Sequence, residues 1–213
     1  VLVDTGKEFV GIDAGAEFTC GLTMNDEIFC WGSDDRGQVG DGGAPNPANG
    51  QDPSQFETRP VEIDSNQAFV DLTVGNFHAC GVTTNDEVYC WGSDGNQQLG
   101  FDVAHTFIPT PRKIMDGATP LQFEQIDAGA NHTCATNLSV SGVPQCWGRN
   151  TDAQTGANTG DSWLYYPTDV STNLTFEQYA LGNDHTCAIA DGSFDMHCWG
   201  SNGSGQLGID DTN

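Results

Sequence analysis

Basic residues are scarce in this sequence. Its 213 residues include 6 Lys plus Arg against 30 Asp plus Glu, so the formal net charge is −24 at pH 7. Proteins bind phosphate backbones through Lys and Arg side chains that displace counterions, and this chain has almost none to offer. The charge therefore argues against nucleic acid or an anionic membrane surface as a partner. It favours cationic partners, or an environment rich in salt or calcium.

Long apolar runs are also missing. No stretch approaches the ~20 apolar residues that a helix needs to cross a bilayer, so we expect no membrane insertion. No signal peptide is visible and the chain begins at Val1, which indicates a processed or excised piece of a longer protein. The 27 Gly and 9 Pro residues, with 37% hydrophobic residues, are typical of a turn-rich all-β protein.

The familiar catalytic motifs are absent as well. Neither G-x-S-x-G nor H-E-x-x-H occurs in the sequence. The glycine-rich segment at 32–37 lacks the G-K-[ST] ending of a phosphate-binding loop, and its glycines suit tight turns. The sequence therefore predicts a protein that is not an enzyme and has no cofactor. A pair of surface carboxylates in a glycan-processing enzyme is the catalytic alternative that stays open.

The sequence does contain a fourfold internal repeat. In each copy a cysteine pair ends in Cys-Trp-Gly, and the second cysteine falls at residues 30, 90, 146 and 198. That spacing fits one four-stranded β-propeller blade per repeat. Apolar residues alternate with polar ones around turns of Gly, Asn and Asp, which predicts short antiparallel hairpins.

We expect one all-β domain over residues 1–213, a partial β-propeller of four tandem four-stranded blades. The blades are predicted at about 1–58, 59–109, 110–165 and 166–213. In this division each later blade begins near a strand that contains proline, where a missing backbone N–H is tolerated. These strands are predicted at 59–63, 110–114 and 166–170.

The eight cysteines fall into four local pairs, one in each repeat. A three-residue loop at 24–26 sets Thr23 opposite Glu27, and the same register places Cys20 opposite Cys30. Facing Cβ atoms of an antiparallel pair lie about 4.5–5.5 Å apart, close to the geometry of a disulfide. We therefore predict four disulfides and an oxidising compartment, extracellular or at the cell surface. The predicted pairs are Cys20–Cys30, Cys80–Cys90, Cys134–Cys146 and Cys187–Cys198.

A metal site is the competing interpretation of the cysteines. His78, His132 and His185 each lie two residues before a cysteine, hence on the same strand face, where a His-Cys-Cys set would suit zinc. The first repeat has Phe18 at this position, and no C-x-x-C spacing occurs. Both observations favour disulfides. Because the histidines recur in phase, we expect them to belong to the blade architecture.

The last two repeats share a longer pattern. The third reads G-A-N-H-T-C at 129–134 and C-W-G at 146–148; the fourth reads G-N-D-H-T-C at 182–187, C-W-G at 198–200 and G-Q-L-G at 205–208. This pattern resembles the regulator of chromosome condensation repeat, in a cysteine-containing form similar to repeats of large secreted or surface proteins, chiefly bacterial ones. The resemblance implies a seven-bladed propeller in the parent protein. Four blades would then form about half a ring with an open edge at each end.

Tryptophans occur both in and out of phase with the repeat. Those in phase are predicted to pack between blades, with the indole N–H bonded to a neighbouring backbone carbonyl. Trp163 is out of phase and stands beside Tyr165 and Tyr166. We interpret these three residues either as an exposed aromatic contact for a partner or as packing for a long loop. The in-phase residues are Trp31, Trp91, Trp147 and Trp199.

Acidic loops and glycosylation sequons provide two further hypotheses. Calcium takes six to eight oxygen ligands, often from Asp side chains, but no loop matches the D-x-[DN]-x-[DN]-G pattern. Solvated surface is the alternative interpretation of these acids. Of the sequons at Asn131, Asn137, Asn173 and Asn202, those at Asn137 and Asn173 lie in longer polar stretches and are the predicted acceptors. The weak calcium candidates are Asp34, Asp35, Asp41, Asp94 and Asp102, with Asp210 and Asp211 near the end.

The leading functional prediction is an extracellular, non-catalytic propeller module for protein binding, adhesion or surface assembly. Its partners are expected to be another protein, a further copy of the chain, or further blades of the parent protein. Contacts are expected in the loops at 43–58, 101–107 and 155–166, where the repeats differ in length. The alternative is a structural filament or coat subunit joined through open blade edges.

Overall fold

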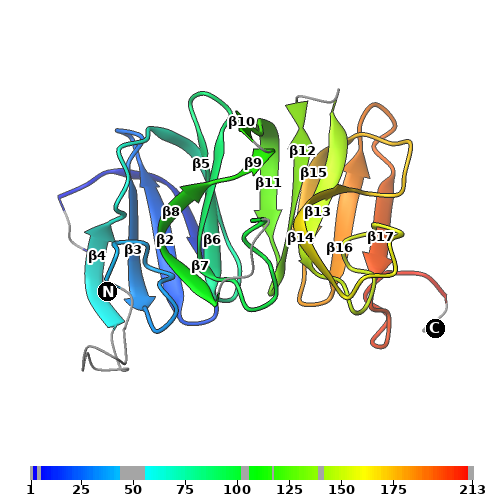
Figure 1. Cartoon of the computed structure of the whole chain (residues 1–213), viewed down its shortest axis with the longest axis horizontal. Coiled ribbons are helices and arrows are strands. Elements are labelled where there is room, and N and C mark those ends of the chain that lie inside the picture. The colour runs from blue at the N-terminus through cyan, green and yellow to red at the C-terminus, as the bar shows by residue number, and fades with distance from the viewer. Residues whose placement is uncertain are drawn as a thin grey trace.

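The computed structural model describes residues 2–3, 6–43, 56–101, 106–116, 118–138 and 142–210. These residues form an all-β fold in which four antiparallel sheets stand side by side (Figure 1). Each sheet follows the chain order of its strands, so each is one consecutive stretch of sequence. We call the sheets blades 1 to 4.

Blades 1 to 3 each contain four strands, and blade 4 contains three within the described residues. Blade 1 consists of β1 (Phe9–Ala14), β2 (Phe18–Thr23), β3 (Ile28–Ser33) and β4 (Phe56–Glu62). Blade 2 consists of β5 (Phe69–Val74), β6 (His78–Thr83), β7 (Val88–Ser93) and β8 (Phe107–Lys113). Blade 3 consists of β11 (Phe123–Ala128), β12 (His132–Asn137), β13 (Val143–Arg149) and β14 (Trp163–Asp169). Blade 4 consists of β15 (Phe176–Leu181), β16 (His185–Ala190) and β17 (Met196–Gly200). A two-stranded hairpin of β9 (Met115–Asp116) and β10 (Thr119–Pro120) lies between blades 2 and 3 in sequence.

The structure corrects the predicted division into blades. Boundaries after residues 58, 109 and 165 fall inside β4, β8 and β14. These proline-containing strands end a blade instead of opening the next, because each pairs with the strand that carries the second cysteine. Val61 pairs with Cys30 and Thr168 with Cys146. The paired strands therefore end at residues 62, 113 and 169.

The central hairpin of each blade is closed by a disulfide. Cys20 and Cys30 are register partners in β2 and β3, as the loop length predicts. At the tip of this hairpin Asp26 has φ of 62°, a left-handed conformation that Asp tolerates in three-residue loops. The longer tips of blades 3 and 4 preserve the cysteine register. The four disulfides are Cys20–Cys30, Cys80–Cys90, Cys134–Cys146 and Cys187–Cys198, the pairs expected from the sequence.

The hydrophobic core lies between the blades. Three clusters of buried apolar side chains each draw on two neighbouring blades. In the first, Phe18 of blade 1 joins Ala79 and Trp91 of blade 2; in the last, Val170 of blade 3 joins Tyr179 of blade 4. A two-faced blade buries apolar area only when a neighbour covers it, so each blade depends on the next for its stability.

Candidate functional site

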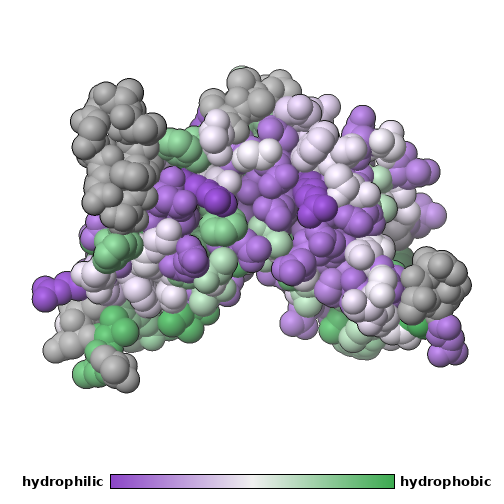
Figure 2. Space-filling model, turned by 90° about the horizontal axis from the view of Figure 1, so that it is seen from below, coloured by the Kyte–Doolittle hydropathy of each residue, from purple (hydrophilic) through white to green (hydrophobic). Residues whose placement is uncertain are grey.

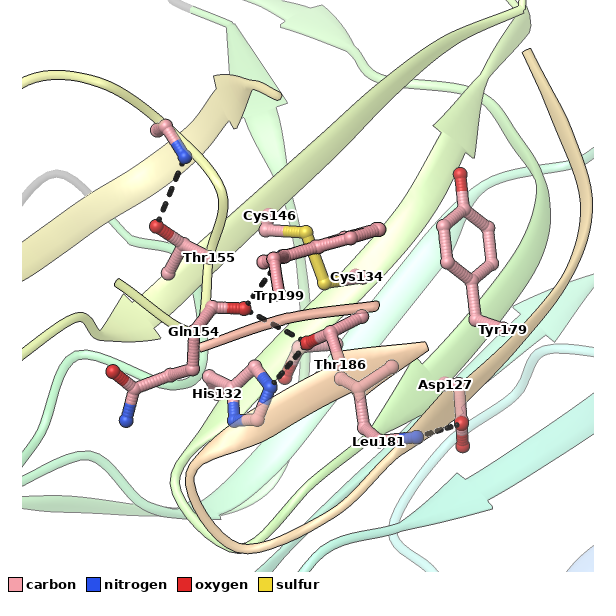
Figure 3. The surroundings of a disulfide bond; sticks show 12 residues. Asp127, His132, Cys134, Cys146, Gln154, Thr155, Tyr179, Leu181, Thr186 and Trp199 are labelled. Carbon is pink, nitrogen blue, oxygen red and sulfur yellow. Dashed lines mark hydrogen bonds between the residues drawn. A yellow bond between two sulfur atoms is a disulfide. The ribbon is translucent and has the colours of Figure 1, made fainter. Parts of the chain in front are cut away.

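A hydrogen-bonded set joins blade 3 to blade 4 (Figure 3). The backbone carbonyl of Gln154, in the loop after β13, accepts the Nε1–H of Trp199 at 2.9 Å and the hydroxyl of Thr186 at 2.8 Å. The Nε2 atom of His132 lies 2.8 Å from the same hydroxyl oxygen. One carbonyl of blade 3 therefore holds two side chains of blade 4, and a histidine of blade 3 completes the set.

The same set recurs between blades 2 and 3. The carbonyl of Gln98 accepts bonds from Trp147 at 2.9 Å and Thr133 at 3.0 Å, and His78 Nε2 lies 2.9 Å from the Thr133 hydroxyl. For Trp147 and Trp199 this confirms the prediction that the in-phase tryptophans pack between blades with a backbone carbonyl as partner. It also assigns His78 and His132, two of the three recurring histidines, to the blade contacts.

The contact between blades 1 and 2 uses an apolar version of this set. Trp91 still donates to the carbonyl of Gln38, at 3.1 Å. Phe18 replaces the histidine and Ala79 replaces the threonine, and both are buried in the same cluster. The two departures from the repeat pattern are therefore partners across one blade contact.

The two inner histidines are held neutral. Thr133 has a single hydroxyl proton and gives it to Gln98, so His78 must donate through Nε2–H. Its Nδ1 atom is buried without a partner among the described residues. Burial lowers the pKa of His78 to about 3. The pKa of His132 is also lowered to about 3, mainly by burial and to a smaller extent by nearby positive charge.

A second line of contacts follows the inner strands. The carboxylate of Asp13 accepts the backbone N–H of Val74 in the next blade at 2.7 Å, and that of Asp127 accepts the N–H of Leu181 at 2.9 Å. The hydroxyl of Thr73, at the same position of blade 2, accepts the N–H of Ala128 at 3.0 Å. Burial raises the pKa of Asp127 to about 6, although its backbone hydrogen bonds act in the opposite direction.

The inner strands line an acidic groove on the hollow side of the molecule. Seen from below, the molecule is arched, with a hollow between its two ends (Figure 2). A groove of about 530 Å³ is lined by residues of β1, β5, β11 and β15. Sequence reasoning did not single out its acids, although Asp13 and Asp127 occupy the same position of their repeats. The lining carboxylates are Asp13, Asp71, Asp127 and Glu177.

The outer edge of blade 3 carries exposed aromatic side chains on β14. Trp163, Tyr165 and Tyr166 are 47%, 45% and 56% exposed, which favours a surface contact over the packing of a loop. The strand register shows that Trp163 does belong to a position of the repeat. It pairs with Arg149 in blade 3, and Phe56 pairs with Ser33 at the equivalent position in blade 1. That outer-strand repeat was hidden by variable loop lengths.

The two tyrosines distinguish β14 from the other outer strands. Aligned on the shared proline of each strand, β4 has Thr58 and Arg59 where β14 has Tyr165 and Tyr166. Strand β8 has Pro109 and Thr110 there. An adjoining aromatic pair on an outer strand is therefore particular to blade 3 among the three four-stranded blades. Of the loops expected to make contacts, 155–166 is described; residues 44–55 and 102–105 lie outside the described residues.

Two of the calcium candidates, Asp34 and Asp94, hold the turns that follow β3 and β7. Asp34 and Asp94 are buried, and each accepts a backbone N–H five residues later, from Val39 at 2.9 Å and Leu99 at 3.1 Å. Burial raises the pKa of Asp34 to about 6. Asp35 accepts the side-chain N–H of Gln38 at 3.1 Å, and Asp41 accepts the backbone N–H of Gly43 at 2.8 Å. Among the described residues, no three His, Cys, Asp or Glu side chains are grouped as a metal site would need. Asp102 and Asp211 lie outside the described part of the chain.

The structure separates the two predicted glycosylation acceptors. Asn173 and its sequon partner Thr175 are exposed in the turn between β14 and β15. Asn137 is only 2% exposed and donates its side-chain N–H to Gln145 at 2.8 Å, so the prediction for Asn137 is wrong for the folded chain. Asn202 is also buried, and its side-chain oxygen accepts the backbone N–H of Leu207 at 3.0 Å.

Comparison with known proteins finds the same repeat. Residues 9–38 and 69–98 match one profile of the Regulator of chromosome condensation (RCC1) repeat, and residues 85–136 match another. The Ultraviolet-B receptor UVR8 of Arabidopsis thaliana is 30% identical over 203 residues, which cover 94% of this chain and 43% of the receptor.

Solved structures show the same architecture. The crystal structure of human WBSCR16 superposes with a TM-score of 0.82 at 17% identity, over 99% of this chain and 52% of that one. Prp20p from Saccharomyces cerevisiae superposes with a TM-score of 0.79 at 17% identity, over 98% of this chain and 49% of Prp20p. The fold is thus a partial β-propeller, as predicted. The chain spans about half the length of these relatives. Separately, no helix of the described residues has the length and hydropathy of a membrane span.

Proposed function

Because the chain belongs to the regulator of chromosome condensation repeat family, we propose that it is a non-catalytic, extracellular module that binds a protein partner. The extracellular setting is supported by the four disulfides, since such bonds persist in oxidising compartments. The non-catalytic role is supported by the two buried histidines, which serve the blade contacts and are held neutral.

The proposed contact surface is the outer edge of β14. A strand at the edge of a sheet presents backbone N–H and C=O groups that a partner segment can pair with. Tyr165 and Tyr166 add large apolar area with polar tips, a combination enriched at the centres of protein interfaces. The single observation that carries the proposal is that the exposed pair Tyr165 and Tyr166 lies on an outer strand and has no aromatic counterpart on β4 or β8.

A basic segment is the partner chemistry that fits this edge. The chain carries a net charge of −24, which steers cationic partners towards it. Its own cations lie over aromatic rings, with Arg36 3.9 Å from the centre of Phe77 and Arg112 4.6 Å from that of Phe101. A partner's Arg or Lys can stack on the exposed tyrosines in the same way.

The acidic groove is a weaker candidate for this role. The carboxylates of Asp13 and Asp127 already accept backbone N–H groups of the next blade. A ligand that recruited them would compete with the contacts that hold the blades together. The edge of β14 has no such conflict, because its aromatic side chains are exposed.

The test is a selection of random peptides displayed on phage against the disulfide-intact chain. Selected peptides are expected to be rich in Arg or Lys and to bind less well at high salt. Replacing Tyr165 and Tyr166 by Ser should lower the affinity for each selected peptide about 30-fold, which corresponds to the loss of an interface hot spot worth about 2 kcal/mol. Binding is measured by titration calorimetry.

The matched control is Phe56→Ser. In blade 1, Phe56 occupies the position that Trp163 has in blade 3, and it is 60% exposed. The substitution therefore removes an exposed aromatic side chain from a different outer strand. It should leave the affinity of the selected peptides unchanged. Selected peptides that bind the tyrosine variant as tightly as the original chain would overturn the proposal.

A further inference from the structure

The turn that joins β14 to β15 presents an asparagine to solvent. Asn173, Leu174 and Thr175 form an N-x-[ST] sequon, and all three residues are exposed. The side-chain amide of Asn173 has no hydrogen-bond partner among the described residues. A bulky group can therefore be attached to this amide without the loss of a contact that the fold uses.

Backbone hydrogen bonds fix the turn on both sides of the sequon. Ser171 donates its N–H to the carbonyl of Gly156 at 3.0 Å, and the carbonyl of Thr175 accepts the N–H of Asp191 at 2.9 Å. These bonds hold the turn to blade 3 on one side and to blade 4 on the other. They use main-chain atoms alone, so the side chains of Asn173 and Thr175 stay accessible.

The other three sequons are taken up by the fold. Asn137 and Asn202 are only 2% and 6% exposed. The sequon of Asn131 is completed by Thr133, which is fully buried. A glycan acceptor needs an accessible asparagine and an accessible hydroxyl residue two positions later. Of the four sequons, that of Asn173 alone meets both conditions in the folded chain.

We propose that Asn173 is a site of N-linked glycosylation. This inference rests on the extracellular setting of the proposed function, because N-linked glycans belong to secreted proteins. The donor is an oligosaccharide held on a lipid through a pyrophosphate group. The amide nitrogen of Asn173 forms a bond to the anomeric carbon of the first sugar and loses one proton. The bond from that carbon to the pyrophosphate oxygen breaks, and the lipid pyrophosphate leaves with the electron pair.

The turn between blades 1 and 2 is built in the same way. Its residues, 63–69, align without a gap with those of the turn that holds the sequon. Asp64 donates its backbone N–H to the carbonyl of Gly40 at 2.8 Å, and the carbonyl of Ala68 accepts the N–H of Thr84 at 3.0 Å. These are the counterparts of the two bonds that fix the later turn. The two turns therefore share one backbone arrangement.

The earlier turn lacks one part of a glycosylation site. Asn66 has the position of Asn173 in this turn and is likewise exposed. Ala68 is also exposed and stands where the later turn has Thr175. Asn66 thus has the backbone setting of an acceptor without the hydroxyl residue that completes a sequon. The chain therefore contains a matched pair of positions on which the inference can be tested.

The test is secretion of the full chain from a eukaryotic cell line behind a cleavable signal sequence. Peptide N-glycosidase releases N-linked glycans and converts their asparagines to aspartates, so peptide mass spectrometry identifies each occupied site. The secreted chain should carry one glycan, on Asn173. Asn173→Gln and Thr175→Ala should each abolish it. Both side chains are exposed, so we expect the two variants to fold and to be secreted.

A variant that gains a site and a matched control complete the set. Ala68→Thr completes a sequon at Asn66 and should add a second glycan there, because the two turns share their backbone arrangement. Asn158→Gln is the control, since Asn158 is exposed but lies outside any sequon. This variant should keep the glycan on Asn173. An Ala68→Thr chain that carries no glycan on Asn66 would contradict the role assigned to the turn.

The outcome for Asn173 is separable from that for the proposed function. A secreted chain with its four disulfides intact and Asn173 unmodified would refute the inference, and so would a folded chain glycosylated on Asn137. Binding of the selected basic peptides is measured on the Asn173→Gln variant, which has no glycan in either case. Peptide binding by this variant, with Asn173 unmodified in the original chain, would refute the glycosylation alone. A glycan on Asn173 without peptide binding by the variant would refute the proposed partner alone.

Discussion

The Nε2 atom of His78 lies 2.9 Å from the hydroxyl oxygen of Thr133, across the contact between blades 2 and 3. One blade earlier the same two positions hold Phe18 and Ala79, both buried in one apolar cluster. A polar pair and an apolar pair thus fill equivalent sites in one chain. Mixed pairs would leave a buried polar group without a partner.

We predict that His78→Phe and Thr133→Ala are not additive. Thr133→Ala alone should lower the free energy of unfolding by about 2 kcal/mol, because it leaves the His78 N–H without an acceptor. The double variant should lose about 1–2 kcal/mol less than the sum of the single losses. Denaturation in guanidinium with intact disulfides measures all four members of the cycle. Additivity within about 0.5 kcal/mol would contradict the pairing.

Stability should fall on acidification, partly through His78. Its folded pKa of about 3 lies below the ordinary histidine value of 6.5, so the unfolded chain takes up the proton first. The stabilising contribution of neutral His78 is complete above pH 6.5 and is lost progressively as the pH falls towards 3. From pH 7 to 5 this loss amounts to about 2 kcal/mol.

The His78→Phe/Thr133→Ala double variant isolates this effect. Asp34 and Asp127, whose pKa values are raised to about 6, act in the opposite direction and stabilise the fold as they gain protons below that pH. They are present in both proteins, so their contributions cancel in the comparison. The difference in unfolding free energy between the two proteins should shrink between pH 7 and 5. A constant difference would contradict the buried neutral histidine.

A glycine on the inner side of blade 3 should not tolerate a side chain. A Cβ atom at Gly129 would lie 2.5 Å from the backbone carbonyl oxygen of Gly182 in blade 4. We expect Gly129→Ala to lower the midpoint of thermal unfolding by several degrees, because backbone on both sides must shift. Gly95→Ala is the control, since nothing lies within 4 Å of its Cβ position. Equal effects of the two substitutions would contradict the close approach of the blades.

The four disulfides should differ in their sensitivity to reduction. Cys187 and Cys198 are partly exposed, whereas the other six cysteines are fully buried. Thiol–disulfide exchange requires access to a sulfur atom, so limiting reductant should open Cys187–Cys198 first. Alkylation followed by peptide mass spectrometry identifies the reduced pair. Uniform labelling of all four pairs in the folded chain would argue against this order.

The repeat, the disulfides and the role of the in-phase tryptophans could be predicted from the sequence because local spacing determines them. Cys20 and Cys30 face each other through one short turn, so no distant contact is needed to place them. Blade boundaries could not be read in the same way. Whether the strand around Val61 joins the preceding or the following blade depends on a partner beyond a long, variable loop.

Surface features were harder to place than core features. The sequons of Asn137 and Asn173 look alike, yet only one side chain is exposed, because the pairing of β12 and β13 brings Asn137 beside Gln145. The relation between Phe18 and Ala79 could not be recognised in the sequence either, because the two residues come together only across a blade contact. The repeat phase of Trp163 emerged only from strand register.

The most direct test of the proposed function is hydrogen–deuterium exchange of the chain with and without a selected basic peptide. If the peptide binds the outer edge of blade 3, backbone amides of β14 should become protected, with little change in β1, β5, β11 and β15. That pattern is the result we predict. Protection confined to the inner strands would place the partner in the acidic groove and contradict the assignment of the edge of β14.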